Sequence, residues 1–291
     1  MKKFSTTVLL IALMCSCTLS PDSKTKKIEF TDSFDQHIVL EKAPARIVSC
    51  APLITEIIYA LGEEKRLCGR TDYCVYPPQA AAVSSIGGLM DPCLECIVKL
   101  EPDLVLASTH FKKSVADKLG QLNYPVAVMM SQQSIAGAEE LISKIGQVLG
   151  VTVKADSVIT HMQQERQRII AKLPVDAPHP SVYYVVGFGK QGDYTAGGDT
   201  FIHELITLAG GKNVAADVKG WGYSLEALMD KDPDVIIIKN PMKQAFCETE
   251  PYNQLSAVKN NRVYEIDNHL IEINGPHIME GLEQLVDIFH P

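Results

Sequence analysis

The sequence lacks two features that would place it on nucleic acid or inside a membrane. It contains no cluster of lysines and arginines, and its formal net charge is −8 over 291 residues. Proteins that bind nucleic acid carry basic patches, so we expect no DNA or RNA partner. Beyond residue 17, no apolar run is long enough to cross a bilayer. We therefore expect the body of the protein to lie outside the membrane.

Motifs for phosphate binding, nucleophilic catalysis and direct metal binding are also missing. GFGKQG (187–192) follows a predicted strand, but it lacks the G-K-[ST] ending and no helix opens directly on it. The chain has no G-x-S-x-G elbow, and no pair of carboxylates at catalytic spacing can be identified. No histidine-rich loop is present to surround a zinc or manganese ion. We expect no enzyme, no resident metal and no cofactor, and a direct zinc or manganese receptor is the weaker alternative.

The first residues have the pattern of a lipoprotein signal peptide. A basic start precedes an apolar core at residues 8–14, and the small residue Ser16 stands before Cys17. We predict that residues 1–17 form the signal and that Cys17 becomes the lipidated anchor; an ordinary signal with an incidental cysteine is the alternative. Residues 18–27 have no apolar periodicity and are predicted to be a tether. The expected location is the periplasm or cell envelope, anchored to a membrane by lipid.

Six cysteines follow the predicted anchor, and an oxidising compartment permits disulfides between them. They are Cys50, Cys68, Cys74, Cys93, Cys96 and Cys247. Cys93 and Cys96 form a C-x-x-C at a predicted helix start, without a second such pair or thioredoxin-like surroundings. This spacing favours a local disulfide or two plain buried thiols over zinc or redox chemistry, and the sequence leaves the overall pairing open.

Strand and helix patterns alternate along the chain, with one interruption. Residues 28–151 begin with a predicted hairpin and continue as alternating strands and helices, which indicates a parallel sheet covered on both faces. Residues 152–173 repeat apolar side chains at helical spacing without glycine or proline. Alternation then resumes over residues 174–291. The predicted fold is α/β, with two Rossmann-like lobes joined by a single long backbone helix.

One helix–strand unit occurs twice, once in each predicted lobe. LECIVKLEPDLVLAS (94–108) and LEALMDKDPDVIIIK (225–239) place Glu95 and Glu226 in the first turn of a helix. An acidic residue there is favoured by the helix dipole, by roughly 0.3–1 kcal/mol, which could explain either glutamate alone. Two rigid lobes would also present the two carboxylates as a pair of fixed anions for a partner with arginines.

The order of motifs resembles that of the substrate-binding proteins for iron chelates and vitamin B12. RIVSCAPLITEIIYALG, GRTDYCVYPP, a Gly pair and the LE…PDLVLAS unit occur in the family's order, and the likeness runs from about residue 28 to the end. The resemblance implies a monomeric receptor that delivers its ligand to an ABC permease dimer with ATPase subunits. It also implies that Glu95 and Glu226 pair with arginines of the permease.

The resemblance and the loop positions together predict a ligand site between the lobes. Its candidate residues are Tyr73, Tyr76, Leu89, Met90, His110, Phe188, Tyr194, Trp221, His269 and Asn274. Cobalamin would meet the aromatic residues, although Leu89 stands where cobalamin receptors can carry tryptophan.

Other ligands and another class of function remain open. An anionic ferric siderophore would need cations, for which Arg70, Lys112 and Lys190 are candidates. Haem would need an axial ligand, for which Tyr76, His110 or His269 could serve. A surface interaction lipoprotein without a small ligand is a further alternative. A helix as the only substantial link between the lobes predicts small lobe motions.

Overall fold

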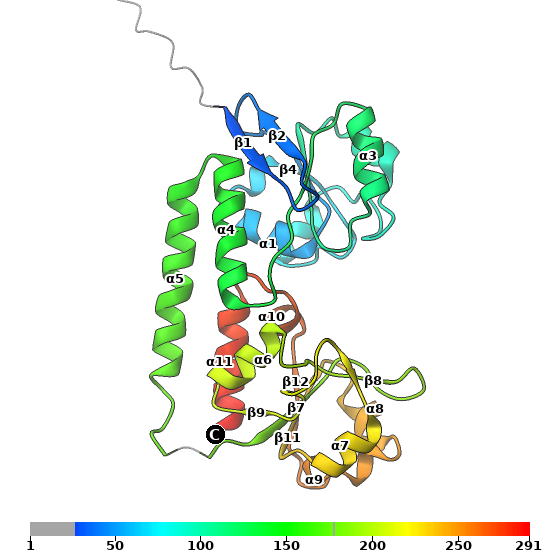
Figure 1. Cartoon of the computed structure of the whole chain (residues 1–291), viewed down its shortest axis with the longest axis vertical. Helices are drawn as coiled ribbons and strands as arrows, with labels where there is room; N and C mark the ends of the chain where they lie inside the picture. The colour runs from blue at the N-terminus through cyan, green and yellow to red at the C-terminus, as the bar shows by residue number, and fades with distance from the viewer. Residues whose placement is uncertain (1–26, 177) are drawn as a thin grey trace, which may run out of the picture.

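The computed structural model describes residues 27–176 and 178–291 (Figure 1). The predicted signal peptide, the anchor Cys17 and nearly all of the predicted tether lie outside these residues. The described chain folds around two separate four-stranded parallel sheets, stacked one above the other along the long axis of the molecule. The fold class predicted from the sequence, two α/β lobes with a long helix between them, is confirmed.

The first lobe begins with the hairpin of β1 (Ile28–Thr31) and β2 (His37–Leu40). Its sheet has the strand order β4-β3-β5-β6, formed by β3 (Ile47–Ser49), β4 (Leu67–Arg70), β5 (Leu104–Ala107) and β6 (Val126–Val128). Its helices are α1 (Pro52–Ala60), α2 (Leu94–Lys99), α3 (Lys113–Gln121) and α4 (Ile135–Leu149). Short 3-10 turns lie at Glu64–Arg66 and Pro78–Ala82.

Alternation of side chains along the strands gives this sheet two buried faces. Ile47 and Leu104 pack with α1 and α4 on one face, whereas Val48 and Val105 pack with α2 and α3 on the other. All four side chains are fully buried. The near-continuous apolar runs in the sequence therefore reflect burial from both sides.

The second lobe repeats this arrangement with the strand order β12-β11-β7-β9. Its strands are β7 (Ser181–Val185), β9 (Lys212–Asn213), β11 (Val235–Lys239) and β12 (Val263–Ile266), and a small ribbon pairs β8 (Asp193–Tyr194) with β10 (Gly222–Tyr223). α6 (Phe201–Leu208) and α11 (Ile278–Phe289) cover one face of the sheet, and α7 (Leu225–Lys231), α8 (Lys243–Glu248) and α9 (Ser256–Lys259) cover the other. The 3-10 turn Tyr252–Gln254 and the short helix α10 (His269–Glu272) complete the lobe.

The long helix α5 (Thr152–Ile170) runs down one side of the molecule, along α4 and then along α11 (Figure 1). Gly146 on α4 allows a close approach, because an added Cβ there would lie 2.4 Å from the Cβ of Ala155. At the other end, Arg168 binds Glu283 of α11. The helix ends at Ile170, three residues before the predicted boundary at 173, because the chain turns at residues 171–173 ahead of Pro174.

Side-chain contacts across the lobes correct the expectation that one helix is the only substantial link. Glu204 of α6 accepts a hydrogen bond at 2.8 Å from the backbone N–H of Ile135, and so caps the first turn of α4. Glu56 of α1 binds His277, just before α11. One apolar cluster also runs through α1, α4, α5, α6 and α11. The lobes are therefore held by a shared layer of helices.

Cys93 and Cys96 form the local disulfide, one of the two arrangements that their spacing favoured. The bond closes the first turn of α2 around Glu95, where the Cys93 sulfur also accepts a hydrogen bond from the N–H of Cys96. The described thiols of Cys50, Cys68, Cys74 and Cys247 are free. Burial raises the pKa of the Cys50 thiol far above its usual range, so this side chain stays protonated at neutral pH.

Candidate functional site: a cleft between the lobes

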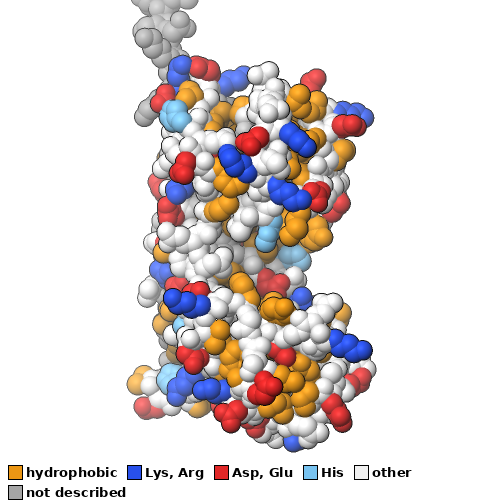
Figure 2. Space-filling view, turned by 45° about the vertical axis from the view of Figure 1, so that its right-hand side comes forward, with side chains coloured by type: hydrophobic (Ala, Val, Ile, Leu, Met, Phe, Trp, Pro, Cys, Tyr) orange, Lys and Arg blue, Asp and Glu red, His pale blue; other side chains and the backbone are white. Residues whose placement is uncertain are grey.

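A cleft with a volume of about 480 Å³ lies between the two lobes and is lined from both. Figure 2 shows the molecule hollowed between its upper and lower halves, with hydrophobic and histidine side chains around the hollow. Loops that leave the carboxyl ends of β3, β5, β6 and β12 supply much of the lining. This is where parallel α/β sheets place ligands, because the loops at those strand ends converge there.

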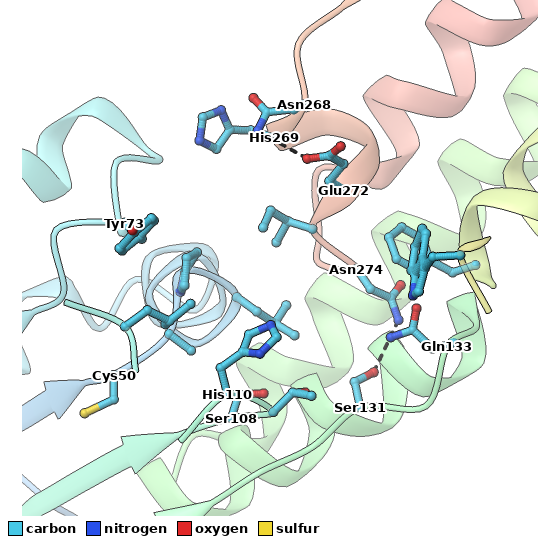
Figure 3. A pocket seen from close by; sticks show the side chains of 18 residues that line it. Cys50, Tyr73, Ser108, His110, Ser131, Gln133, Asn268, His269, Glu272 and Asn274 are labelled. Atoms are coloured by element: carbon cyan, nitrogen blue, oxygen red, sulfur yellow. Dashed lines mark hydrogen bonds between the residues drawn. The ribbon is translucent and has the colours of Figure 1, made fainter. Parts of the chain in front are cut away.

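Six of the ten candidate ligand residues line this cleft. They are Tyr73, Leu89, His110, Trp221, His269 and Asn274. The His110 side chain points into the cleft from the first lobe, and Tyr73 lies along the same wall (Figure 3). Tyr73 is 60% exposed and Trp221 is 39% exposed, so both aromatic rings keep free surface for a ligand. Contact with a ligand stays a prediction for all six.

The other four candidates lie elsewhere. The rings of Tyr76 and His277 pack edge to face, with centroids 4.1 Å apart. Phe188 is packed within the second lobe against Phe246, at 5.1 Å. Met90 and Tyr194 are exposed outside the lining of the cleft. The presence of an aromatic or apolar residue in a loop was therefore not enough to tell whether its side chain lines the cleft, packs inside a lobe or is exposed outside the cleft.

The cleft also contains residues that the sequence pattern did not single out. They are Cys50, Ala51, Pro52, Leu53, Ser108, Thr109, Ser131, Gln133, Phe201, Asn268, Glu272 and Ile273. Most of them directly follow a strand or begin the next helix. The signal that could have found them was position after each predicted parallel strand, whatever the residue type.

The described lining of the cleft contains one carboxylate, Glu272, but no lysine or arginine. It therefore carries no permanent positive charge. The three candidate cations are engaged or exposed elsewhere. Arg70 donates to backbone carbonyls, including that of Thr71 at 3.0 Å. Lys112 binds Asp91 at 2.6 Å, and Lys190 is exposed outside the lining.

Two histidines in the lining, His110 and His269, have ring nitrogen atoms that could coordinate the metal ion of a bound chelate. His269 Nδ1 lies 2.9 Å from Asp267 Oδ1. Burial acts to raise the pKa of Asp267, but hydrogen bonds from His269 outweigh it and leave that pKa below its ordinary value. In a neutral imidazole whose proton on Nδ1 faces Asp267, Nε2 keeps its lone pair. Across the described part of the chain, no three His, Cys, Asp or Glu side chains gather to hold a bare metal ion.

Glu95 and Glu226 occupy matching positions in the two lobes. Each is exposed in the first turn of its helix, α2 or α7. Cys93 caps α2 and Ser224 caps α7 through their side chains, so both first turns are fixed locally. Their role in docking stays a prediction.

The two-lobed fold with a ligand-sized cleft is that of a ligand-binding protein, and the sequence agrees with it. The profile of the periplasmic binding protein family matches residues 47–270. The chain therefore belongs to the periplasmic binding protein family. Within residues 27–176 and 178–291, no helix combines the length and apolarity needed to cross a membrane.

Several relatives carry the names of binding proteins. An uncharacterized ABC transporter substrate-binding lipoprotein of Bacillus subtilis, YvrC, is 31% identical over 98% of this chain and 95% of its own. A cobalamin-binding protein of Halobacterium salinarum is 28% identical over 89% of this chain and 73% of its own. The crystal structure of a periplasmic haem-binding protein of Pseudomonas aeruginosa is similar with a TM-score of 0.77 and 25% identity, covering 85% of this chain and 93% of that one.

Proposed function

We propose that the chain is the substrate-binding lipoprotein of an ABC importer and that its cleft binds a corrinoid of the cobalamin type. The observation that carries the proposal is the lining of the cleft, which combines exposed aromatic rings with polar groups and contains no lysine or arginine among its described residues. Similarity to YvrC supports the role of a substrate-binding lipoprotein, and similarity to the cobalamin-binding protein of Halobacterium salinarum supports the corrinoid as ligand.

Tyr73 and Trp221 explain how a flat macrocycle would be bound. They line the cleft from opposite lobes, and each retains exposed ring surface. A corrin ring placed between them would bury apolar area on both of its faces, at about 25 cal/mol for each Å² removed from water. Hydroxyl and amide side chains such as Ser108 and Gln133 would meet polar groups on the ligand's periphery.

The absence of described cations argues against strongly anionic ligands. A ferric catecholate carries several negative charges, and its capture requires arginines or lysines that pair with its oxygens. In this cleft it would instead meet Glu272. Repulsion between like charges in a partly dry site opposes binding.

Haem is the second candidate, and one observation favours it. His110 points into the cleft, and His269 is held through Nδ1 by Asp267, which leaves Nε2 available as an axial ligand. The haem-binding protein of Pseudomonas aeruginosa shares this fold. The two propionates of haem would lack a described cationic partner in the lining, so we rank haem below a corrinoid.

Thermal unfolding with a panel of ligands tests the proposal. Cyanocobalamin should raise the melting temperature in a concentration-dependent manner, since a ligand that binds only the folded state stabilises it by RT ln(1 + [L]/Kd). Haemin and a ferric catecholate serve as comparison ligands. A shift of the melting temperature with haemin alone would identify haem, and not a corrinoid, as the ligand. No shift with any of the three compounds would favour a surface interaction lipoprotein without a small ligand.

Delivery to the permease completes the proposed role. Glu95 and Glu226 would each contact arginines of a permease dimer that works with ATPase subunits, and Cys17 would hold the receptor at the membrane by lipid. The matching positions and local caps of the two glutamates support this part of the proposal. Binding of the purified receptor to its permease in nanodiscs, with and without each glutamate, is the direct test.

A further inference from the structure

Glu272 places an anchored carboxylate on the second lobe's wall of the cleft. It is the last residue of α10, and its Oε1 accepts a hydrogen bond at 3.0 Å from the hydroxyl of the buried Tyr184. The amide of Asn268 lies 3.4 Å from Oε2 (Figure 3). A carboxylate can accept about four hydrogen bonds, and these two leave capacity toward the cleft.

Asn274 adds a second acceptor two residues further along. Its amide nitrogen faces three oxygens of the first lobe: Ser131 Oγ at 3.3 Å, Gln132 O at 3.0 Å and Ser134 O at 2.9 Å. These contacts fix the orientation of the amide, because only the nitrogen can donate.

The oxygen of this amide has no partner in the described chain. Asn274 lines the cleft and is 5% exposed, and its Oδ1 accepts a hydrogen bond from none of the described residues. A buried acceptor left without a donor costs about 1–3 kcal/mol. Since Oδ1 has almost no solvent-accessible surface, a ligand N–H would reach it only after a small local opening of the wall, and it would then remove that penalty.

We propose that Glu272 and Asn274 select the ligand by N–H donors on its periphery, and that the groups they recognise are primary carboxamides. The inference rests on the proposed corrinoid function and specifies which chemistry of the corrinoid is recognised. Corrinoids of the cobalamin type carry several primary amides around the ring, whereas the side chains of haem end in carboxylates. Converting the recognised amide to a carboxylate removes the donor and places a negative charge against Glu272.

The experiment compares cyanocobalamin with its separated monocarboxylic acids, in each of which one propionamide has been hydrolysed to a propionate. Affinities are measured at pH 7 by calorimetry on the mature chain. The wild-type protein should bind at least one of the monoacids about tenfold more weakly than cyanocobalamin and the others nearly as well, because only amides facing this wall are recognised. Glu272→Gln keeps the side-chain shape and the acceptor for Tyr184, and it should restore much of the affinity for the disfavoured monoacid.

Glu29→Gln is the matched control, since Glu29 is an exposed glutamate on β1 outside the lining of the cleft. It should leave the discrimination between amide and acid unchanged. Equal binding of every monoacid by the wild type would overturn the inference while leaving the corrinoid function intact. Unchanged discrimination in Glu272→Gln would overturn it in the same way. Failure of cyanocobalamin itself to bind refutes the proposed function as well, and the first titration detects that case.

Discussion

Removal of the Glu56 carboxylate tests how firmly the two lobes are joined. Glu56 lies on α1 with 2% of its surface exposed. Its Oε1 accepts from the backbone N–H of His277 at 3.1 Å and lies 2.7 Å from Nδ1 of the same residue. The chain approaches so closely that a Cβ on Gly275 would lie 2.6 Å from this oxygen. Glu56→Ala leaves the backbone N–H and the ring Nδ1 of His277 without their partner in the other lobe.

The expected loss follows from these contacts. A hydrogen bond to a charged group contributes about 1.5–3 kcal/mol, and Glu56 takes part in two contacts of this kind with His277. Because the side chain of His277 is still 21% exposed, water can replace part of the interaction. We expect Glu56→Ala to lower the free energy of unfolding by about 2–4 kcal/mol. The melting temperature should fall by about 5–15 °C.

Urea denaturation and thermal circular dichroism at pH 7 measure the effect. Glu280→Ala is the control, since Glu280 also lies near His277, at 3.9 Å from Nε2, but has a side chain that is 61% exposed. It should change the stability by less than about 0.5 kcal/mol. Hydrogen exchange in residues 270–278 should rise in Glu56→Ala alone. Equal stabilities for the two variants would refute the reasoning that this contact holds the lobes together.

Three further predictions concern the surface and the cleft. Arg168 and Lys172 hold the pKa of Glu283 near 2, below the ordinary value of 4.5. Glu283→Gln should therefore lower the free energy of unfolding by less than about 1 kcal/mol at pH 7. In urea titrations at different pH values, this difference should fade as pH falls from 4.5 through 2, and a difference that stays constant would contradict the prediction. Glu95→Lys or Glu226→Lys should weaken permease binding and leave ligand affinity intact, and a loss of ligand affinity would count against docking. Trp221→Ala should weaken corrinoid binding about tenfold or more in calorimetry, and unchanged affinity would remove Trp221 from the site.

The architecture could be predicted from the sequence because its signals are local. PDLVLAS contains β5 and SVYYVVG contains β7, since continuous apolar runs mark strands buried on both faces. Two stretches of alternating strands and helices, one on each side of a long helix with apolar periodicity, were enough to predict the fold class. The end of α5 was placed three residues too late, because apolar Leu173 extended the helical pattern past the turn.

The site was harder to predict, because its side chains are placed by partners far along the chain. Phe188 occupies a loop, yet Phe246 and Tyr252 hold it within the second lobe. Asn274 meets residues that precede it by about 140 positions. Glu272 gave no local signal, because the absence of cations around it becomes visible only when both lobes are in place.

The layer of helices shared by the lobes has a consequence for how an importer would tell a full receptor from an empty one. We expect two bodies joined by α4, α5 and α11 to keep nearly the same outline whether or not cargo is present, because one apolar cluster runs through these helices. A change of shape would then carry little information to the transporter. The distinction would have to come from the cargo itself, through the part left visible at the open side of the molecule.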